Sequence, residues 1–294
     1  MHIFSGRTAE RFQRKIESRG EAYKKAFTVW QNWFLSKYNS DLIENNDDPI
    51  EKIADDWKEE LSRWKVDRGI FIALHSDEDE LAEFVRRGDG IFSGIAATDI
   101  NDPGAADIFK KRVTEDGFRG LKLYPTIEGF SPSDKRLYPV YETARFYDVP
   151  VMFHFGLTLQ YDADMAYANP VTLHQVMKDF PEVKFIIPHF GAGYLQEVLF
   201  LAYHVQNLFI DTSGTNRWIE YLPYELTLEQ VFKKSLAVVG PERILFGTDS
   251  RMLSKGYRYS VLKSQMKILD SLNLSREETA LIMGENSKRL FFRS

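Results

Sequence analysis

The chain has 294 residues, of which 44% are hydrophobic and 28% are charged, and it contains 22 Phe, 14 Tyr and 5 Trp. This composition supplies a large core and a solvated surface, and it excludes a disordered or low-complexity protein. The net charge is −5 and there is no long basic run, which argues against a nucleic-acid partner. Because there is no cysteine, only His, Asp and Glu side chains could hold a metal.

The same features bound the location and the partners of the protein. No stretch approaches the roughly 18 consecutive apolar residues of a membrane helix, and the first residues lack the basic and apolar regions of a signal peptide. We therefore expect a cytoplasmic protein that acts on a small molecule, without a membrane or nucleic-acid partner, and that could form a homo-oligomer.

Helix and strand patterns alternate along the chain after a helical preface. Residues 7–66 carry apolar side chains at helical spacing, which predicts at least two helices whose aromatic residues mainly pack in the core. Apolar runs then predict strands near residues 70, 92, 121, 152, 186, 209 and 246. Helices are expected between these strands, and two more at 258–271 and 275–283, the second with Ser275 and Glu278 in capping-box spacing.

This alternation predicts one domain, residues 1–294, folded as a (β/α)8 TIM barrel, an architecture of typically about 250 residues. Only Met1–Phe4 is left to supply the first of the eight strands, and strands are usually about 5 to 6 residues long. We therefore expect a truncated first strand, followed by residues 7–66 as a helical insertion. The truncation should expose the hydrogen-bonding edges of the flanking strands.

Three of the expected strands end in a residue that can bind a metal. His154 follows the apolar run 150–153, His189 follows 183–188, and Asp249 follows 243–248. Since the carboxyl ends of barrel strands share one face, we expect these side chains to converge on one cavity. Two imidazoles and a carboxylate suit a cation such as Zn²⁺. A strand-end histidine can equally be a hydrogen-bonded structural residue, and for His189 both interpretations stay open.

Six short segments, in order, resemble motifs of the amidohydrolase superfamily. They are most similar to the amidohydrolase-related branch, which includes decarboxylases of the aminocarboxymuconate semialdehyde type and various lactone and amide hydrolases. The resemblance covers the chain from His2 to Phe291 and implies a metal-dependent enzyme on a barrel. The segments are MHIFS at 1–5, GFRGLKLYP at 117–125, MFHFG at 152–156, PHFG at 188–191, LFGTDS at 245–250 and GENSKRLF at 284–291.

The resemblance also implies roles for individual residues. In the family, a His-x-His pair on the first strand, a histidine on the fifth and an aspartate on the eighth bind a divalent metal, and a histidine on the sixth polarises the substrate. By this correspondence His154 and Asp249 are metal ligands, and Asp249 also carries protons. His189 is a ligand or an electrophilic partner, and His2 is the second histidine of the pair.

Met1 stands at the middle position of the His-x-His pair, so the first histidine has no counterpart in this chain. We expect Met1 to be an internal methionine of a longer protein and the chain as given to bind metal weakly. The alternative is a natural chain that has lost or weakened its metal binding.

Two cations are candidates for binding an anionic group of the substrate. Lys122, in the expected strand 120–124, could bind a carboxylate, form a carbamate that bridges two metals, or extend its ammonium beyond the strand; we favour the first. Arg251, two residues after Asp249, could hold a carboxylate through two hydrogen bonds, or it could be a plain surface residue.

Three classes of function follow. The first is a metal-dependent hydrolase of a small carboxylated or cyclic amide, ester or lactone, with zinc as the expected metal, Asp249 moving the proton of the attacking water and His189 stabilising the oxyanion. The second is a non-oxidative decarboxylase, a lyase, in which Asp249 protonates the carbon that loses carbon dioxide. The third is a barrel catalytically impaired by loss of the first histidine and retained for binding or structure.

Overall fold

The computed structural model describes residues 1–2, 10, 13–14, 16–38, 48–73, 78–251 and 256–292. The strands are β1 (Gly69–Ile72), β2 (Phe92–Ile95), β3 (Leu121–Leu123), β4 (Val151–Phe153), β5 (Phe185–Ile187), β6 (Leu208–Asp211) and β7 (Ile244–Leu245). They confirm the seven strands that the sequence predicts, and they are shorter than the apolar runs because pairing ends where the strands splay toward the loops.

Helices follow the strands in the expected alternation. The α-helices are α2 (Glu21–Tyr38), α3 (Ile50–Arg63), α4 (Glu78–Arg87), α5 (Ala105–Thr114), α6 (Pro125–Glu128), α7 (Tyr138–Phe146), α8 (His174–Asp179), α9 (Leu195–His204), α10 (Leu228–Val239), α11 (Tyr259–Ser271), α12 (Arg276–Ala280) and α13 (Asn286–Phe291). The 3₁₀ turns are η1 (Lys135–Leu137), η2 (Met165–Tyr167), η3 (Pro170–Leu173), η4 (His189–Gly191), η5 (Arg217–Tyr221) and η6 (Pro241–Arg243), and η7 (Leu281–Glu285) is a π-helical turn.

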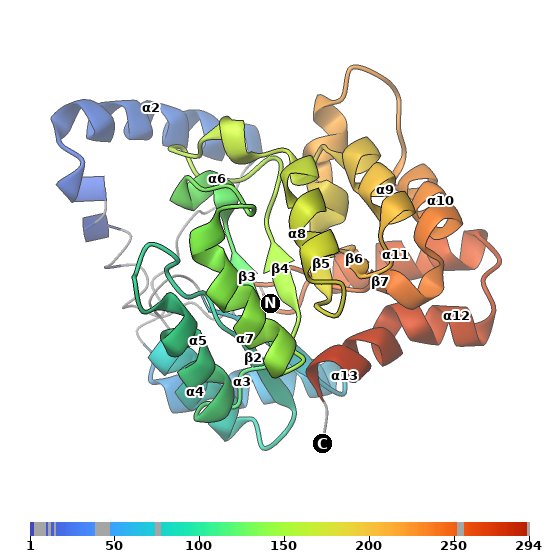
Figure 1. Ribbon diagram of the computed structural model, residues 1–294. Coiled ribbons are helices and arrows are strands. Elements are labelled where there is room, and N and C mark those ends of the chain that lie inside the picture. Colours follow the sequence, from blue (N-terminus) through green and yellow to red (C-terminus); the bar gives the residue numbers. More distant parts are fainter. Residues whose placement is uncertain are drawn as a thin grey trace.

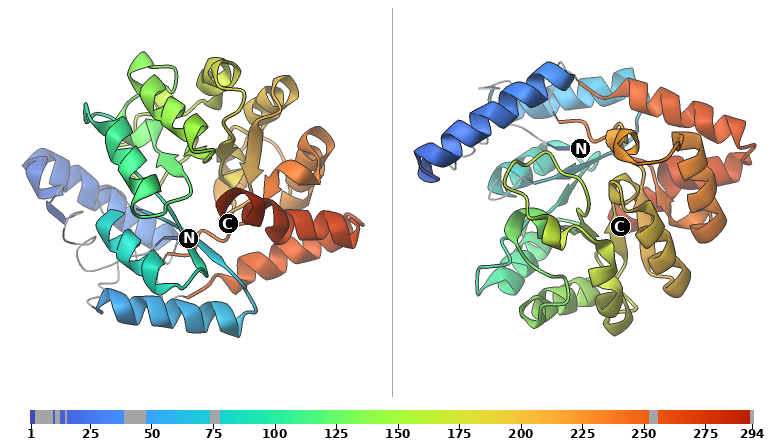
Figure 2. Two further views of the ribbon diagram at one scale, coloured as in Figure 1. Left: turned by 60° about the horizontal axis from the view of Figure 1, so that its bottom comes forward. Right: turned by 90° about the horizontal axis from the view of Figure 1, so that it is seen from above.

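All strand pairs are parallel and follow the order of the sequence, which gives a TIM barrel with helices outside (Figures 1 and 2). The pair β1–β2 and the five-stranded sheet β3–β7 are joined by a single bridge between Ala96 and Leu121. Each connection is long enough to carry a crossover helix, as parallel pairing requires. The carboxyl ends of the strands therefore share one face of the barrel.

Met1 and His2 occupy the position of the first strand, between β1 and the segment that follows β7. Ile72 N donates to Met1 O at 2.8 Å, and His2 N donates to Ser250 O at 2.8 Å. The expectation that the β1 edge would be exposed is therefore wrong at these positions, because two residues suffice to pair with it. Residues 3–9, which include the rest of the expected first strand, lie outside the described residues.

The barrel interior is an apolar layer with one cation in it. Six strands point one apolar side chain inward, and β3 contributes Lys122, which pairs in register with Met152 of β4. Lys122 is 3% exposed, so its ammonium lies among apolar neighbours near the carboxyl end of the barrel. The apolar side chains of the layer are Ile72, Ile95, Met152, Ile186, Phe209 and Leu245.

Helices α2 and α3 precede β1, in agreement with the prediction of at least two helices before that strand. The stripe Ile53, Trp57 and Leu61 of α3 is buried in the core beside β1, where Trp57 contacts Phe71 edge to face. Helix α2 lies on the side of the carboxyl ends of the strands (Figure 1). The turn expected at 45–49 falls mostly outside the described residues.

The last helices also match the prediction. Ser275 accepts from Glu278 N at 3.1 Å, and the Glu278 carboxylate accepts from Ser275 N at 2.8 Å, which completes the predicted capping box. In the part of the chain that the structure describes, no helix has both the length and the apolar character needed to cross a membrane.

We expect Gln265→Ala to lower the free energy of unfolding by about 2–3 kcal/mol, because it creates a cavity, leaves the buried Thr212 hydroxyl without its acceptor and removes one of the two side-chain donors to Thr212 O. Gln265 Nε2 donates to Thr212 O at 2.8 Å, and Thr212 Oγ1 donates to Gln265 Oε1 at 2.7 Å. Urea unfolding measures the change. The exposed substitution Lys267→Ala on the same helix should change stability by less than about 0.5 kcal/mol; equal effects of the two variants would contradict the assignment.

Candidate active site

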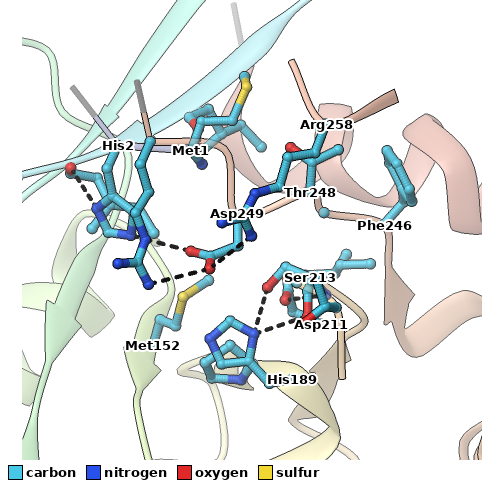
Figure 3. A pocket seen from close by; sticks show the side chains of 18 of the residues that line it. Met1, His2, Met152, His189, Asp211, Ser213, Phe246, Thr248, Asp249 and Arg258 are labelled. Carbon is cyan, nitrogen blue, oxygen red and sulfur yellow. Dashed lines mark hydrogen bonds and ion pairs between the residues drawn. The ribbon is translucent and has the colours of Figure 1, made fainter. Parts of the chain in front are cut away.

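A cavity of about 1210 Å³ opens at the carboxyl ends of the strands and extends inside the barrel as far as Phe291. All six residues that the sequence singles out line it, and Figure 3 shows part of its wall. The predicted convergence on one cavity is thus confirmed, whereas the chemical roles of the residues stay predictions. The six residues are His2, Lys122, His154, His189, Asp249 and Arg251.

His154 and His189 lie side by side, with ring centroids 5.2 Å apart. His154 directly follows β4, and its Nε2 lies 3.3 Å from Leu157 O. A carbonyl oxygen can only accept, so Nε2 carries the proton and Nδ1 keeps a lone pair. The loop after β4 approaches η4 so closely that a Cβ on Gly156 would come within 2.4 Å of Ala192 O, which explains the glycine two residues after His154.

His189 is held by the segment after β6. Its Nδ1 lies 2.9 Å from Ser213 O and 3.0 Å from Ser213 Oγ, and Asp211 Oδ1 accepts from Ser213 N at 2.8 Å. A carbonyl oxygen can only accept, so Nδ1 carries a proton and Nε2 is the ring nitrogen that this contact leaves unused. His189 and Phe190 have φ of 57° and 54°, in the left-handed region that non-glycine residues seldom adopt. Such backbone conformations gather at functional sites.

Asp249 shares this unusual backbone conformation, with φ of 53°. Its carboxylate lies 3.6 Å from His2 Nε2, 3.7 Å from the Arg251 guanidinium and 3.5 Å from that of Arg258 (Figure 3). Burial opposes ionisation, but Arg251, then His189, His2 and Arg258, outweigh it and hold the pKa of Asp249 well below its usual value. Asp249 is therefore ionised at neutral pH.

His2 is buried and neutral. Burial lowers its pKa from 6.5 to about 3, although Asp249 acts in the opposite direction. His2 Nδ1 lies 3.2 Å from Ile72 O, so this nitrogen carries the proton and Nε2 faces Asp249 with a lone pair. Burial likewise holds the pKa of His154 well below 6.5, with help from Lys122 and His189.

Lys122 reaches the cavity from inside the barrel. Burial lowers the pKa of its ammonium from 10.5 to about 8, against the attraction of Asp211 and Asp249. At neutral pH it is still mostly charged. A charged group in an apolar layer is costly unless an anion compensates it, and Asp211 and Asp249 compensate part of this charge. The three sequence interpretations of Lys122 stay predictions.

The donor chemistry of His2, His154, His189 and Asp249 fits a divalent metal. Each imidazole gives one ring N–H to a backbone carbonyl and keeps the other nitrogen free, the usual arrangement of metal-binding histidines. The His2–Asp249 separation of 3.6 Å suits two ligands that each lie about 2 Å from one ion. Over the described residues, no three His, Asp or Glu side chains come close enough together to enclose a cation as they stand.

The structure adds residues that the sequence analysis did not select. Arg258 pairs with Asp249 and lines the cavity, but it lies at the start of a helix rather than at the end of a strand, so no motif marks it. The insertion also contributes Trp30, Trp33 and Trp64 to the cavity wall. The sequence left both core packing and a position in the pocket wall open for the aromatic residues of these helices and favoured the core. Trp57 is buried in the core, whereas Trp30, Trp33 and Trp64 line the cavity, because helical spacing does not tell a cavity wall from a core.

The sequence profile described as amidohydrolase matches residues 61–293 of the chain. The chain belongs to the amidohydrolase family. The resemblance found in the sequence motifs is thereby confirmed, and family members of known structure include both hydrolases and decarboxylases.

Individual relatives are distant. Protein fluG of Emericella nidulans is 26% identical over 108 residues, which cover 37% of this chain and 12% of that protein. A probable 2-pyrone-4,6-dicarboxylic acid hydrolase from Acinetobacter baumannii superposes with a TM-score of 0.63 at 14% identity, covering 86% of this chain and 92% of the other. A 5-carboxyvanillate decarboxylase from Novosphingobium aromaticivorans, in complex with manganese, gives 0.60 at 13% identity, covering 80% and 78%. At 14% and 13% identity, the similarity to these two solved structures shows that the fold is shared.

The neutral histidines should make the fold sensitive to acid. As the pH falls from about 6.5 to about 5.5, the unfolded chain takes up protons at His2 and His154 that the folded chain does not, because folding lowers both pKa values. The free energy of unfolding should then fall by about 1 kcal/mol per histidine. In the His154→Asn variant, the free energy of unfolding should fall by about 1 kcal/mol less over the same pH range, because one titrating histidine is gone. Urea unfolding of both chelator-treated proteins at the two pH values measures this difference. The same decrease in both proteins would contradict the assignment.

Proposed function

We propose that this protein is a metal-dependent hydrolase of small carboxylated or cyclic amides, esters or lactones. The observation that supports it most is the set of three carbonyl-held imidazoles and an ionised carboxylate at the carboxyl face of an amidohydrolase-family barrel. His2, His154 and Asp249 would hold the cation, and His189 would either join them or face the substrate. Composition and charge further support a cytoplasmic location without nucleic-acid or membrane partners.

A divalent cation bound here would lower the pKa of a water molecule and polarise the scissile carbonyl. Zinc suits the His and Asp donors, and the manganese in the Novosphingobium enzyme makes that ion a second choice. Asp249, ionised at neutral pH, takes the proton of the attacking water on its carboxylate and passes it to the leaving group. His189, held by Ser213, directs Nε2 to the substrate oxygen, and once protonated it donates a hydrogen bond to the developing oxyanion.

A non-oxidative decarboxylase is the second candidate, and a specific arrangement favours it. Arg251 and Arg258 both flank Asp249, so a substrate carboxylate bound to them would lie beside it. Asp249 would first take a proton from water or from a hydroxyl of the substrate, and would then deliver it to the carbon as carbon dioxide leaves. Release of carbon dioxide, rather than of a new carboxylic acid, distinguishes this reaction from hydrolysis.

Metal removal tests both candidates. Dialysis against a chelator should abolish turnover of a panel of aryl esters, lactones, N-acyl amides and hydroxybenzoates, and addition of Zn²⁺ or Mn²⁺ should restore it. Metal analysis of the same samples follows binding independently of turnover. Activity that survives complete metal removal would refute the proposal, and a protein that neither binds metal nor turns over any substrate would favour the impaired barrel.

Asp249→Asn should lower kcat by about 100-fold or more while the protein stays folded, because an amide cannot accept the proton and is a poor metal ligand. The control is Asp270→Asn, an exposed position on α11, which should keep wild-type activity. Turnover of Asp249→Asn within a few-fold of wild type would remove Asp249 from the mechanism.

A further inference from the structure

The cavity is polarised along its depth in an unusual sense. Lys122 is 3% exposed and reaches the cavity from inside the barrel, whereas Arg251 and Arg258, which flank Asp249, have side chains 39% and 33% exposed. The mouth of the cavity carries apolar side chains that remain substantially exposed: Trp33 at 51%, Tyr221 at 48%, Leu157 at 46% and Leu159 at 42%. The rim of a polar substrate site is normally polar, so this rim is an apolar surface placed next to a charged interior.

The apolar rim is built from three separate segments. Trp33 belongs to α2, Leu157 and Leu159 to the loop after β4, and Tyr221 to η5 after β6. Contiguous exposed apolar surface on one side of a pocket marks a binding surface, because water contact there is unfavourable.

Helix α2 is fixed over the mouth on two sides. The Tyr161 ring in the loop after β4 packs against three aromatic rings of α2, with centroids 5.6 Å from Tyr23, 6.3 Å from Phe27 and 6.0 Å from Trp30. On the other side the Lys37 ammonium lies 5.3 Å from the Trp33 ring centroid and 4.9 Å from that of Tyr221. The aromatic wall is therefore part of the packed structure.

We propose that the substrate is an amphipathic carboxylic acid. Its carboxylate lies at Lys122, Arg251 and Arg258, and an alkyl or aryl group extends outward to the rim formed by Trp33, Leu157, Leu159 and Tyr221. This inference deepens the proposed function, since it concerns the same cavity, and it depends on binding rather than on turnover. Charge complementarity favours the carboxylate of the ligand at the cations, and the exposed apolar rim favours its alkyl or aryl group at the opposite end.

Binding of unreactive fatty acids tests the proposal without any reaction. We expect octanoate to bind at least ~10-fold more tightly than butanoate in calorimetry, because four further methylenes leave water at the rim. Octan-1-ol, which lacks the carboxylate, should bind about 10-fold more weakly than octanoate. These ratios should be the same before and after treatment with a chelator, so loss of metal or of turnover would overturn the proposed function and leave this inference standing.

Matched variants locate the two ends of the ligand. Trp33→Ala should reduce the octanoate-to-butanoate ratio to about 3-fold or less, whereas Phe146→Ala, which removes a 79% exposed ring outside the cavity, should leave it unchanged. Arg251→Gln, at a partly exposed position, should weaken both acids by a similar factor and preserve the ratio. Lys122→Met should do the same more strongly, provided that circular dichroism shows a native fold.

Three outcomes would overturn the inference. Equal affinity for butanoate and octanoate would remove the apolar subsite, and equal loss in Trp33→Ala and Phe146→Ala would show that the effect is not located at the rim. Octan-1-ol binding as tightly as octanoate, together with no effect of Arg251→Gln, would remove the carboxylate subsite.

Discussion

The site depends on three hydrogen bonds between imidazoles and backbone carbonyls. The rings of His2, His154 and His189 each lie within hydrogen-bond distance of a carbonyl that follows or ends a strand: Ile72 O, Leu157 O and Ser213 O. A carbonyl accepts only, so each contact fixes one tautomer and leaves the other nitrogen as a lone pair. Burial then keeps His2 and His154 neutral. These carbonyls therefore fix the orientation of the three rings, and burial, not the carbonyl contacts, disfavours the protonated form of His2 and His154.

The barrel sets where these carbonyls lie. Parallel strands in sequence order bring all carboxyl ends to one face, and the apolar runs of the sequence were sufficient to predict this arrangement and the position of His154 at a strand end. The positive φ values of His189 and Asp249 were not predicted, because Asp and His are enriched in the left-handed region but residue type alone does not say which of them adopts it. That conformation is imposed by packing among the loops after β5, β6 and β7, which no local sequence pattern encodes.

Of the charged residues in the site, some could be predicted from their position in a strand, whereas others are brought there only by the fold. Lys122 was a candidate from its strand position, and the register of β3 against β4 explains why it points inward beside Met152. Arg258 was missed because its role comes from the fold bringing the start of α11 to Asp249. Arg251 and Arg258 together keep Asp249 ionised although burial opposes ionisation, so the acidity of this carboxyl belongs to the assembled site and not to its sequence motif.

The insertion before β1 changes what the barrel can bind. Barrel strands supply polar residues at fixed depth, and the loops and inserted helices above them determine which substrate reaches that depth. Here α2 is tied to the loop after β4 through Tyr161 and to η5 through Lys37, so its aromatic face becomes one wall of the cavity. The helical spacing of Trp30 and Trp33 predicted the helix and not the direction of its apolar face. That direction follows from contacts with segments more than a hundred residues away, so the sequence pattern alone could not show that these rings line the cavity.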